Sequence, residues 1–219
     1  MLFFPTHTVG DTQLMPWPAG ARAIGYCREA ANPRAIWLMM HGNAGQAADR
    51  DYVLKCLSPL DSLYVLEYPG YGSREGSPSL TAMNAAAREA YELLRSRHPA
   101  VPVCVLGESI GSGPACALSR AKPPPDKIVL VVPFDVLANV AARRFPFLPV
   151  RLLLRDAWDN VESLQGYRGP VEIFAAEADT IIPVAHARNL AKQVPGAHFV
   201  AFAGGHNDWS EAERVKLRP

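Results

Sequence analysis

One short segment limits the possible folds of this chain more than any other. Residues 103–113 read V-C-V-L-G-E-S-I-G-S-G, so a strand-like apolar run passes through G-E-S-I-G into a run of small residues. This spacing is the G-x-S-x-G pattern of a nucleophile elbow, in which glycines make room for a tight strand-to-helix turn. The bare pattern also arises by chance, but the β-rich residues before it and the helix-compatible residues after it supply the expected context. We therefore expect Ser109 to project its hydroxyl from the end of a strand.

Length and composition indicate one globular domain that covers residues 1–219. The chain is 49% hydrophobic and has a formal net charge of +1, so it can bury a core and has no general attraction for nucleic acid. No apolar run reaches the roughly 20 residues that cross a bilayer, and residues 1–5, M-L-F-F-P, lack the features of a signal peptide. We expect a cytoplasmic protein with no nucleic-acid partner and no stable membrane insertion; the oligomeric state stays open.

The cysteines and the motif inventory indicate neither a disulfide framework nor a metal site. Cys27, Cys56, Cys104 and Cys116 have no C-x-x-C spacing, and three of them lie in apolar patterns, which favours buried reduced thiols. The sequence contains no H-E-x-x-H and no G-x-x-x-x-G-K-[ST] motif, the usual signs of zinc-protease and nucleotide chemistry. We expect no metal and no cofactor.

Apolar runs and helical patterns alternate along the chain. Strands are expected at residues 35–40, 63–67, 101–106, 128–132, 171–176 and 198–202, and helices at 46–57, 80–97, 110–121 and 184–193. The strands are too uniformly apolar for a one-sided sheet, so the alternation predicts an α/β fold with a mostly parallel sheet covered on both faces. Residues 1–29 are compatible with an antiparallel hairpin at the sheet edge. Ser210 and Glu213 have the spacing of a capping box for a last short helix.

Residues 135–167 interrupt this alternation and are interpreted as a small cap insertion. The insertion holds the one basic cluster of the sequence, which comprises Arg143, Arg144, Arg151 and Arg155. These arginines either form solvated faces paired with nearby acidic residues or contact an anionic substrate group or a membrane surface. We expect Phe145, Phe147 and Leu148 to line a wall of an acyl pocket suited to short or medium chains.

A serine hydroxyl is a weak nucleophile at neutral pH, so Ser109 needs a general base and the base needs an acceptor. His206 is the preferred base because it follows an apolar strand and a Gly-Gly turn, where parallel sheets place their ligands. Asp179 is the preferred acid because it follows the preceding strand, which gives the Ser-Asp-His chain order of α/β-hydrolases. Asp135 also follows a strand and is the main competitor, and Asp208 is a weaker one. The other histidines fit less well; His186, on an expected helix, is interpreted as a surface or packing residue.

Attack on a carbonyl also requires donors for the developing oxyanion. Ile110 can offer its backbone N–H at the start of the elbow helix. A second donor is expected from the loop after strand 35–40, where residues 41–45 read H-G-N-A-G, and we assign it to the N–H of Asn43. His41 is then interpreted as a residue that braces this loop.

Taken together, these motifs resemble the α/β-hydrolase superfamily, and more narrowly the Bem46 and α/β-hydrolase domain 13 and 17 group. The resemblance rests on residues 41–45, 67–76 (E-Y-P-G-Y-G-S-R-E-G), 107–111, 133–135 (P-F-D) and 147–151 (F-L-P-V-R). It implies a serine hydrolase of esters or thioesters in which Asp179 and His206 match the acid and base positions. The membrane-associated or cysteine-rich N-terminal segments of eukaryotic relatives are absent from this sequence, which favours a small-molecule esterase over a protein depalmitoylase. An amidase, a peptidase, an acyltransferase and a non-catalytic binding or signalling relative are the alternatives.

Overall fold

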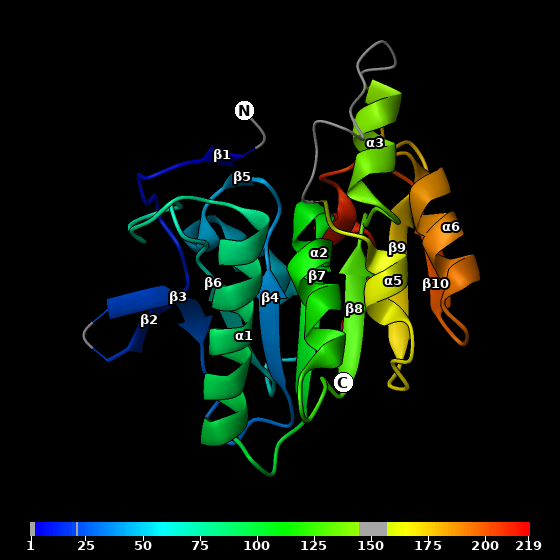
Figure 1. The fold of residues 1–219 in the computed structure, drawn as a ribbon. Helices are drawn as coiled ribbons and strands as arrows, with labels where there is room; N and C mark the ends of the chain where they lie inside the picture. The colour runs from blue at the N-terminus through cyan, green and yellow to red at the C-terminus, as the bar shows by residue number, and fades with distance from the viewer. Residues whose placement is uncertain (1–2, 21, 145–156) are drawn as a thin grey trace.

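The computed structural model describes residues 3–20, 22–144 and 157–219. Their centre is an eight-stranded sheet with the order β10-β9-β8-β7-β4-β6-β3-β2 (Figure 1). Every pairing is parallel except the two that β3 makes, with β6 and β2. The strands are β2 (Met15–Ala19), β3 (Arg22–Arg28), β4 (Ile36–Met40), β6 (Ser62–Leu66), β7 (Val103–Glu108), β8 (Lys127–Val131), β9 (Val171–Ala176) and β10 (His198–Phe202). The hairpin expected at the sheet edge is confirmed as β2–β3.

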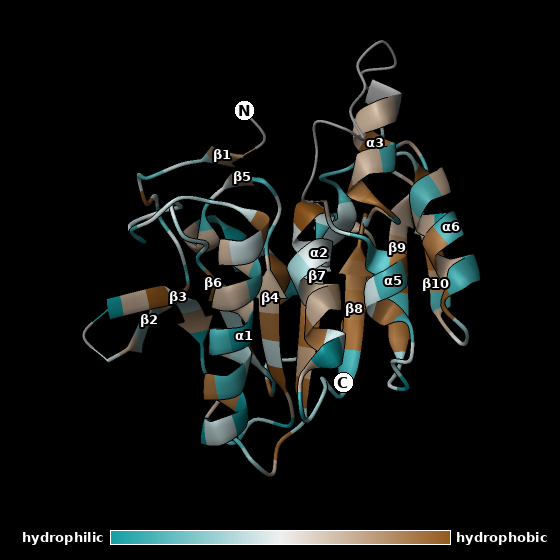
Figure 2. Cartoon of the chain, viewed as in Figure 1, coloured by the Kyte–Doolittle hydropathy of each residue, from teal (hydrophilic) through white to brown (hydrophobic). Residues whose placement is uncertain are grey.

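The central strands are apolar along their whole length because both faces of the sheet are covered. In β4, Ile36, Leu38 and Met40 join one buried cluster, whereas Trp37 and Met39 join the other. Successive side chains of a strand point to opposite faces, so each cluster receives every second residue. Figure 2 shows mostly apolar residues along the central strands and a mixture of hydrophilic and apolar residues on the helices.

Different elements cover the two faces. The face seen in Figure 1 carries α1 (Leu80–Arg97), α2 (Ser112–Ala117), α5 (Asn160–Leu164) and α6 (Val184–Gln193). The opposite cluster contains residues of the 3₁₀ elements η1 (Ala47–Cys56) and η4 (Trp209–Glu211), with Val215 and Leu217 beyond them. A two-stranded pairing of β1 (Phe4–Pro5) with β5 (Ala44–Gly45) ties the N-terminal segment to the loop after β4. The predicted fold class is confirmed.

Several elements predicted from the sequence differ in detail from those in the structure. The expected helix at 110–121 is divided into η2 (Ser109–Gly111), α2 and η3 (Leu118–Arg120), and the expected helix at 46–57 is the 3₁₀ element η1 with a non-helical Arg50 inside. The predicted capping box of Ser210 and Glu213 is wrong. The last helical turn begins at Trp209, so Ser210 lies within it. The Asp208 side chain, at the cap position, instead accepts from the N–H of Gly205 at 2.7 Å.

The cap insertion is described only at its two ends. α3 (Leu137–Arg144) leaves the sheet after β8, and α5 returns to it. Residues 145–156, which include Phe145, Phe147, Leu148, Arg151 and Arg155, lie outside the described residues. The pocket wall and the role of the arginines therefore stay predictions.

Two further sequence expectations concern the cysteines and the membrane. All four cysteines are buried and free, as predicted, and burial raises the pKa of the Cys104 thiol to about 12. In the part of the chain that the structure describes, no helix combines the length and the apolar character that a membrane span needs. The cytoplasmic location stays a prediction.

Candidate active site

The turn after β7 holds Ser109 in a rare backbone conformation. Its φ of +54° lies in the left-handed region, which costs a non-glycine residue about 1–2 kcal/mol. The flanking glycines explain how the turn fits. A Cβ on Gly107 would lie 2.7 Å from the Cβ of Ala115, and one on Gly111 would lie 2.1 Å from the carbonyl oxygen of Met40. The sequence G-E-S-I-G thus allows the strand, the following helix and the loop after β4 to pack closely around Ser109.

Ser109, His206 and Asp179 form one chain of hydrogen bonds. The Oγ of Ser109 lies 2.9 Å from Nε2 of His206, and Nδ1 of His206 lies 2.7 Å from Oδ2 of Asp179. A carboxylate only accepts, so Nδ1 carries the proton and Nε2 is left to accept from the serine hydroxyl. The other oxygen of Asp179 accepts from the N–H groups of Ile181 and Ile182, both at 2.8 Å. These contacts fix the carboxylate and, through it, the orientation of the imidazole.

Asp135, the main competitor for the acid position, pairs with a different histidine. Its Oδ1 lies 2.8 Å from Nδ1 of His186, and its Oδ2 accepts from the side-chain amide of Asn189 at 2.7 Å. Burial alone would raise the pKa of Asp135, but hydrogen bonds from His186, the Val136 N–H and Asn189 hold it below its ordinary value. His186 is buried, so it is not a surface residue, and its bond to Asp135 goes beyond the packing role expected for it.

The loop after β4 lies directly against the elbow. Its Gly42 N–H donates to Oε2 of Glu108 at 2.8 Å, and the hydroxyl of Tyr71 donates to the backbone oxygen of Asn43 at 2.9 Å. The same Cβ on Gly111 would lie 2.7 Å from the carbonyl oxygen of His41. This contact brings the loop of Asn43 beside the helix start that carries Ile110. The two backbone amides expected to bind an oxyanion therefore belong to adjoining segments.

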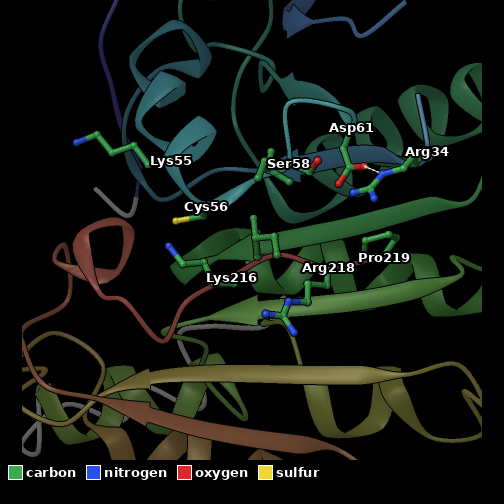
Figure 3. A pocket seen from close by; sticks show the side chains of 10 residues that line it. Arg34, Lys55, Cys56, Ser58, Asp61, Lys216, Arg218 and Pro219 are labelled. Carbon is green, nitrogen blue, oxygen red and sulfur yellow. Dashed lines mark ion pairs between the residues drawn. The ribbon is translucent and has the colours of Figure 1, made fainter. Parts of the chain in front are cut away.

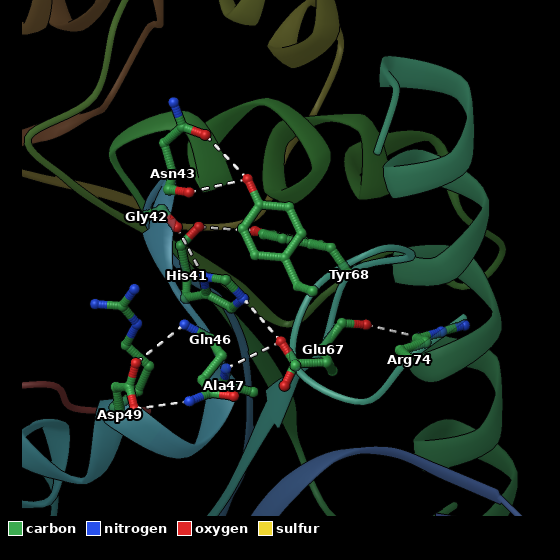
Figure 4. A network of polar contacts seen from close by, with 12 residues as sticks. His41, Gly42, Asn43, Gln46, Ala47, Asp49, Glu67, Tyr68 and Arg74 are labelled. Atoms are coloured by element: carbon green, nitrogen blue, oxygen red, sulfur yellow. Dashed lines mark hydrogen bonds and ion pairs between the residues drawn. The ribbon is translucent and has the colours of Figure 1, made fainter. Parts of the chain in front are cut away.

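A network of buried polar contacts holds the loop after β4 (Figure 4). Nδ1 of His41 donates to the carbonyl oxygen of Gly42 at 2.7 Å, and its Nε2 lies 3.6 Å from Oε1 of Glu67. The same Glu67 oxygen accepts from the Ala47 N–H at 3.0 Å, and the hydroxyl of Tyr68 donates to the His41 carbonyl at 2.8 Å. His41 therefore contacts its own loop and the segment after β6, consistent with the bracing role expected from the sequence.

The sequence assigned no role to Glu67, Tyr68, Tyr71 or Glu108, although all are buried beside the loop or the elbow. The available signals were the E-Y-P-G-Y stretch at 67–71 and a charged residue at the first variable position of the elbow pattern. Neither shows which atoms the side chains contact, because their partners lie on distant segments.

Comparisons with known proteins support the fold. No family model matches the chain. An uncharacterized Mycobacterium tuberculosis protein, Rv2307c, is 35% identical over 176 residues, which cover 78% of this chain and 62% of that protein. The lysophosphatidylserine lipase ABHD12 of Macaca fascicularis is 30% identical over 214 residues, which cover 86% of this chain and 54% of the lipase. The Pyrococcus furiosus esterase Pf2001 is 15% identical and superposes with a TM-score of 0.69 over 95% of both chains. The chain belongs to the α/β-hydrolase superfamily.

This α/β-hydrolase spans about half to two thirds of the length of the curated relatives it matches. The relatives include ABHD12 and ABHD12B proteins, and the narrower resemblance to the Bem46 and domain 13 and 17 group stays a prediction.

A cavity of about 560 Å³ lies away from the triad of the α/β-hydrolase (Figure 3). Its lining includes Arg34, Lys55, Asp61, Lys216 and Arg218. Arg34 lies two residues before the start of β4, and Asp61 directly precedes β6. The cavity therefore borders the amino ends of strands whose carboxyl ends face the Ser109 side of the sheet. It is therefore separate from the candidate active site.

Proposed function

We propose that this α/β-hydrolase cleaves carboxylic esters or thioesters through an acyl-enzyme on Ser109, with His206 as general base and Asp179 as its orienting acid. The observation that carries the proposal is the hydrogen-bond chain from Ser109 through His206 to Asp179 at 2.9 and 2.7 Å. These three side chains supply the nucleophile, the proton acceptor and the group that fixes the imidazole tautomer. The proposed reaction needs no metal and no cofactor.

In the proposed acylation step, Ser109 Oγ attacks the carbonyl carbon while its proton moves to Nε2 of His206. The carbonyl oxygen becomes an oxyanion, to which the N–H groups of Asn43 and Ile110 donate; one such donor lowers the barrier by about 2.7–4 kcal/mol in comparable enzymes. When the tetrahedral intermediate collapses, the bond to the leaving oxygen or sulfur breaks. That atom takes the proton from His206, and the acyl group stays on Ser109.

Deacylation repeats these steps with water. His206 accepts a proton from the water molecule as its oxygen attacks the acyl carbon, and the proton then returns to Ser109 when the intermediate collapses. The carboxylic acid leaves and the resting triad is restored. Asp179 stays ionised throughout and stabilises the transient imidazolium.

The proposed substrates are small-molecule esters or thioesters with short to medium acyl chains. The names of the relatives, a lysophosphatidylserine lipase and an esterase, favour ester substrates. The chain-length preference rests on the small cap expected at residues 135–167. It is tested by rates on aryl esters of increasing acyl length, measured beside a long-chain acyl thioester and an aryl amide. Faster turnover of the amide than of every ester would favour an amidase instead.

Labelling with a fluorophosphonate probe tests the nucleophile. The wild-type protein should react at a single serine and lose activity in parallel. Ser109→Ala should abolish both labelling and turnover. Ser119→Ala is the matched control, because Ser119 Oγ donates to the Ser163 carbonyl at 2.5 Å and has no proposed part in catalysis. A folded protein that neither takes the probe nor hydrolyses any ester of the panel would favour a non-catalytic relative.

A further inference from the structure

The residue before the candidate nucleophile, Glu108, is a buried carboxylate with three hydrogen-bond donors. Its Oε2 accepts from the Gly42 N–H at 2.8 Å, and its Oε1 accepts from the Tyr52 hydroxyl at 2.8 Å and the indole Nε1–H of Trp209 at 2.9 Å. Glu108 is 7% exposed. Removing an ionised carboxylate from water is unfavourable in free energy unless such bonds compensate. The ester chemistry proposed above uses none of these contacts.

The donors come from the segments that carry the remaining machinery. Gly42 belongs to the loop of Asn43, and Trp209 lies in the segment that directly follows His206. Trp209 is fully buried and meets the ring of Tyr52 edge-on, with centroids 5.6 Å apart. A single side chain therefore joins the elbow, the loop after β4 and the segment after β10.

Arg50 completes this cluster and holds the same loop at a second point. One of its nitrogens donates to the Tyr52 hydroxyl at 3.2 Å, and the other donates to the carbonyl oxygen of Ala44. Burial alone would raise the pKa of Glu108, but the charge of Arg50 and the bonds from Trp209, Gly42 and Tyr52 lower it. The loop is thus held through the N–H of Gly42 by an anion and through the carbonyl of Ala44 by a cation, on the two sides of Asn43.

We propose that Glu108 is a positioning residue that fixes the Asn43 loop and the His206 segment relative to Ser109. Because the Gly42 N–H is bonded to Glu108, it is not directed at a substrate, and this bond anchors the loop one residue before the Asn43 N–H. The kinetic consequence of this role rests on the proposed function. The positioning itself is a property of the folded protein and can be measured without a substrate.

The kinetic test compares Glu108→Gln, which removes the charge of the carboxylate, with two variants that each remove one of its hydrogen-bond donors. Glu108→Gln should lower kcat on the order of 10²-fold, and Trp209→Phe and Tyr52→Phe on the order of 10-fold, with KM changed less than about threefold. Trp37→Phe is the control for Trp209→Phe, because Trp37 is equally buried and its indole N–H has no hydrogen-bond partner. Tyr64→Phe is the control for Tyr52→Phe, because it removes a 2.7 Å bond to Glu29. When a control variant loses as much melting temperature as the variant it is paired with, its kcat should stay within about twofold of the wild-type value.

Hydrogen exchange of backbone amides tests the positioning directly. Glu108→Gln should increase exchange in peptides covering both 41–46 and 205–211, and Trp209→Phe only in the second. The proposal would be overturned if the variants showed wild-type exchange in these segments and a kcat within about twofold of the wild-type value. If Glu108→Gln fails to fold, the same exchange and kcat comparisons are made on Trp209→Phe and Tyr52→Phe, and the same result would overturn the proposal. A protein that takes no fluorophosphonate and hydrolyses no ester would refute the proposed function, whereas the exchange result would still decide the role of Glu108.

Discussion

The Asp135 carboxylate lies 2.8 Å from Nδ1 of His186, so the aspartates that follow β8 and β9 each bind a different histidine. Only the Asp179–His206 pair continues to a serine hydroxyl, that of Ser109. The Asp135–His186 pair lies between the end of β8 and helix α6 and ties these elements together. Two similar carboxylates therefore have different expected roles.

Exchanging each carboxylate for an amide separates these roles. Asp179→Asn should lower kcat on the order of 10⁴-fold, because an amide can hold the imidazole in the wrong tautomer. Asp135→Asn should keep kcat within about tenfold but destabilise the fold by about 1–3 kcal/mol, because buried groups lose their charged partner. Steady-state kinetics and urea unfolding of both variants check this. A larger loss of kcat in Asp135→Asn would show that the acid has been misassigned.

The parts of the fold that were predictable from the sequence depend on local patterns. The strands 171–176 and 198–202 and the helices 80–97 and 184–193 were predicted with the bounds the structure has, because apolar periodicity and turn residues delimit them. The helix expected at 110–121 was not predicted with its observed bounds. The left-handed turn at Ser109 leads first into a 3₁₀ turn, η2, before α2 begins. Periodicity does not distinguish these two kinds of helix.

The parts of the site that could not be predicted depend on long-range pairing. The position of an aspartate after a strand does not determine which histidine it will meet, so Asp135 and Asp179 stayed alternatives. Glu108 shows the same limit, since its donors are 66, 56 and 101 residues away along the chain. Only the fold brings these groups together.

Gly111→Ala tests the close contact between the elbow and the loop after β4. The added Cβ would lie 2.1 Å from the carbonyl oxygen of Met40 and 2.7 Å from that of His41, so the backbone must shift. We expect a loss of at least about 2 kcal/mol in the free energy of unfolding and a large loss of fluorophosphonate labelling. Gly10→Ala is the control, because a Cβ there meets nothing within 4 Å. Equal stabilities of the two variants would contradict the close packing.

Tyr71→Phe tests whether the position of the Asn43 loop matters for turnover. The variant removes the hydroxyl that donates to the backbone oxygen of Asn43 at 2.9 Å and lies 3.0 Å from its side-chain oxygen. We expect kcat to fall about 3- to 10-fold with little change in KM, because the loop is less well fixed. Tyr91→Phe, which removes a 3.0 Å bond to the Pro123 carbonyl, is the control. If both variants lose the same activity, the effect is a general loss of stability.

The acid side of the stability profile should reflect Glu108. Its pKa is lower in the folded protein than its ordinary value, so the folded state binds fewer protons than the unfolded chain as the pH falls below about 4.3. The carboxylate therefore stabilises the fold above that pH, and this contribution is lost as the pH falls through the lowered pKa. Urea unfolding should show that the free energy of unfolding of Glu108→Gln is lower than that of the wild-type protein by a constant amount above about pH 5. This difference in the free energy of unfolding should narrow below about pH 4. Glu75→Gln removes an exposed ion pair with Arg22 and should show no such narrowing. A difference that stays constant to pH 3 would contradict the lowered pKa of Glu108.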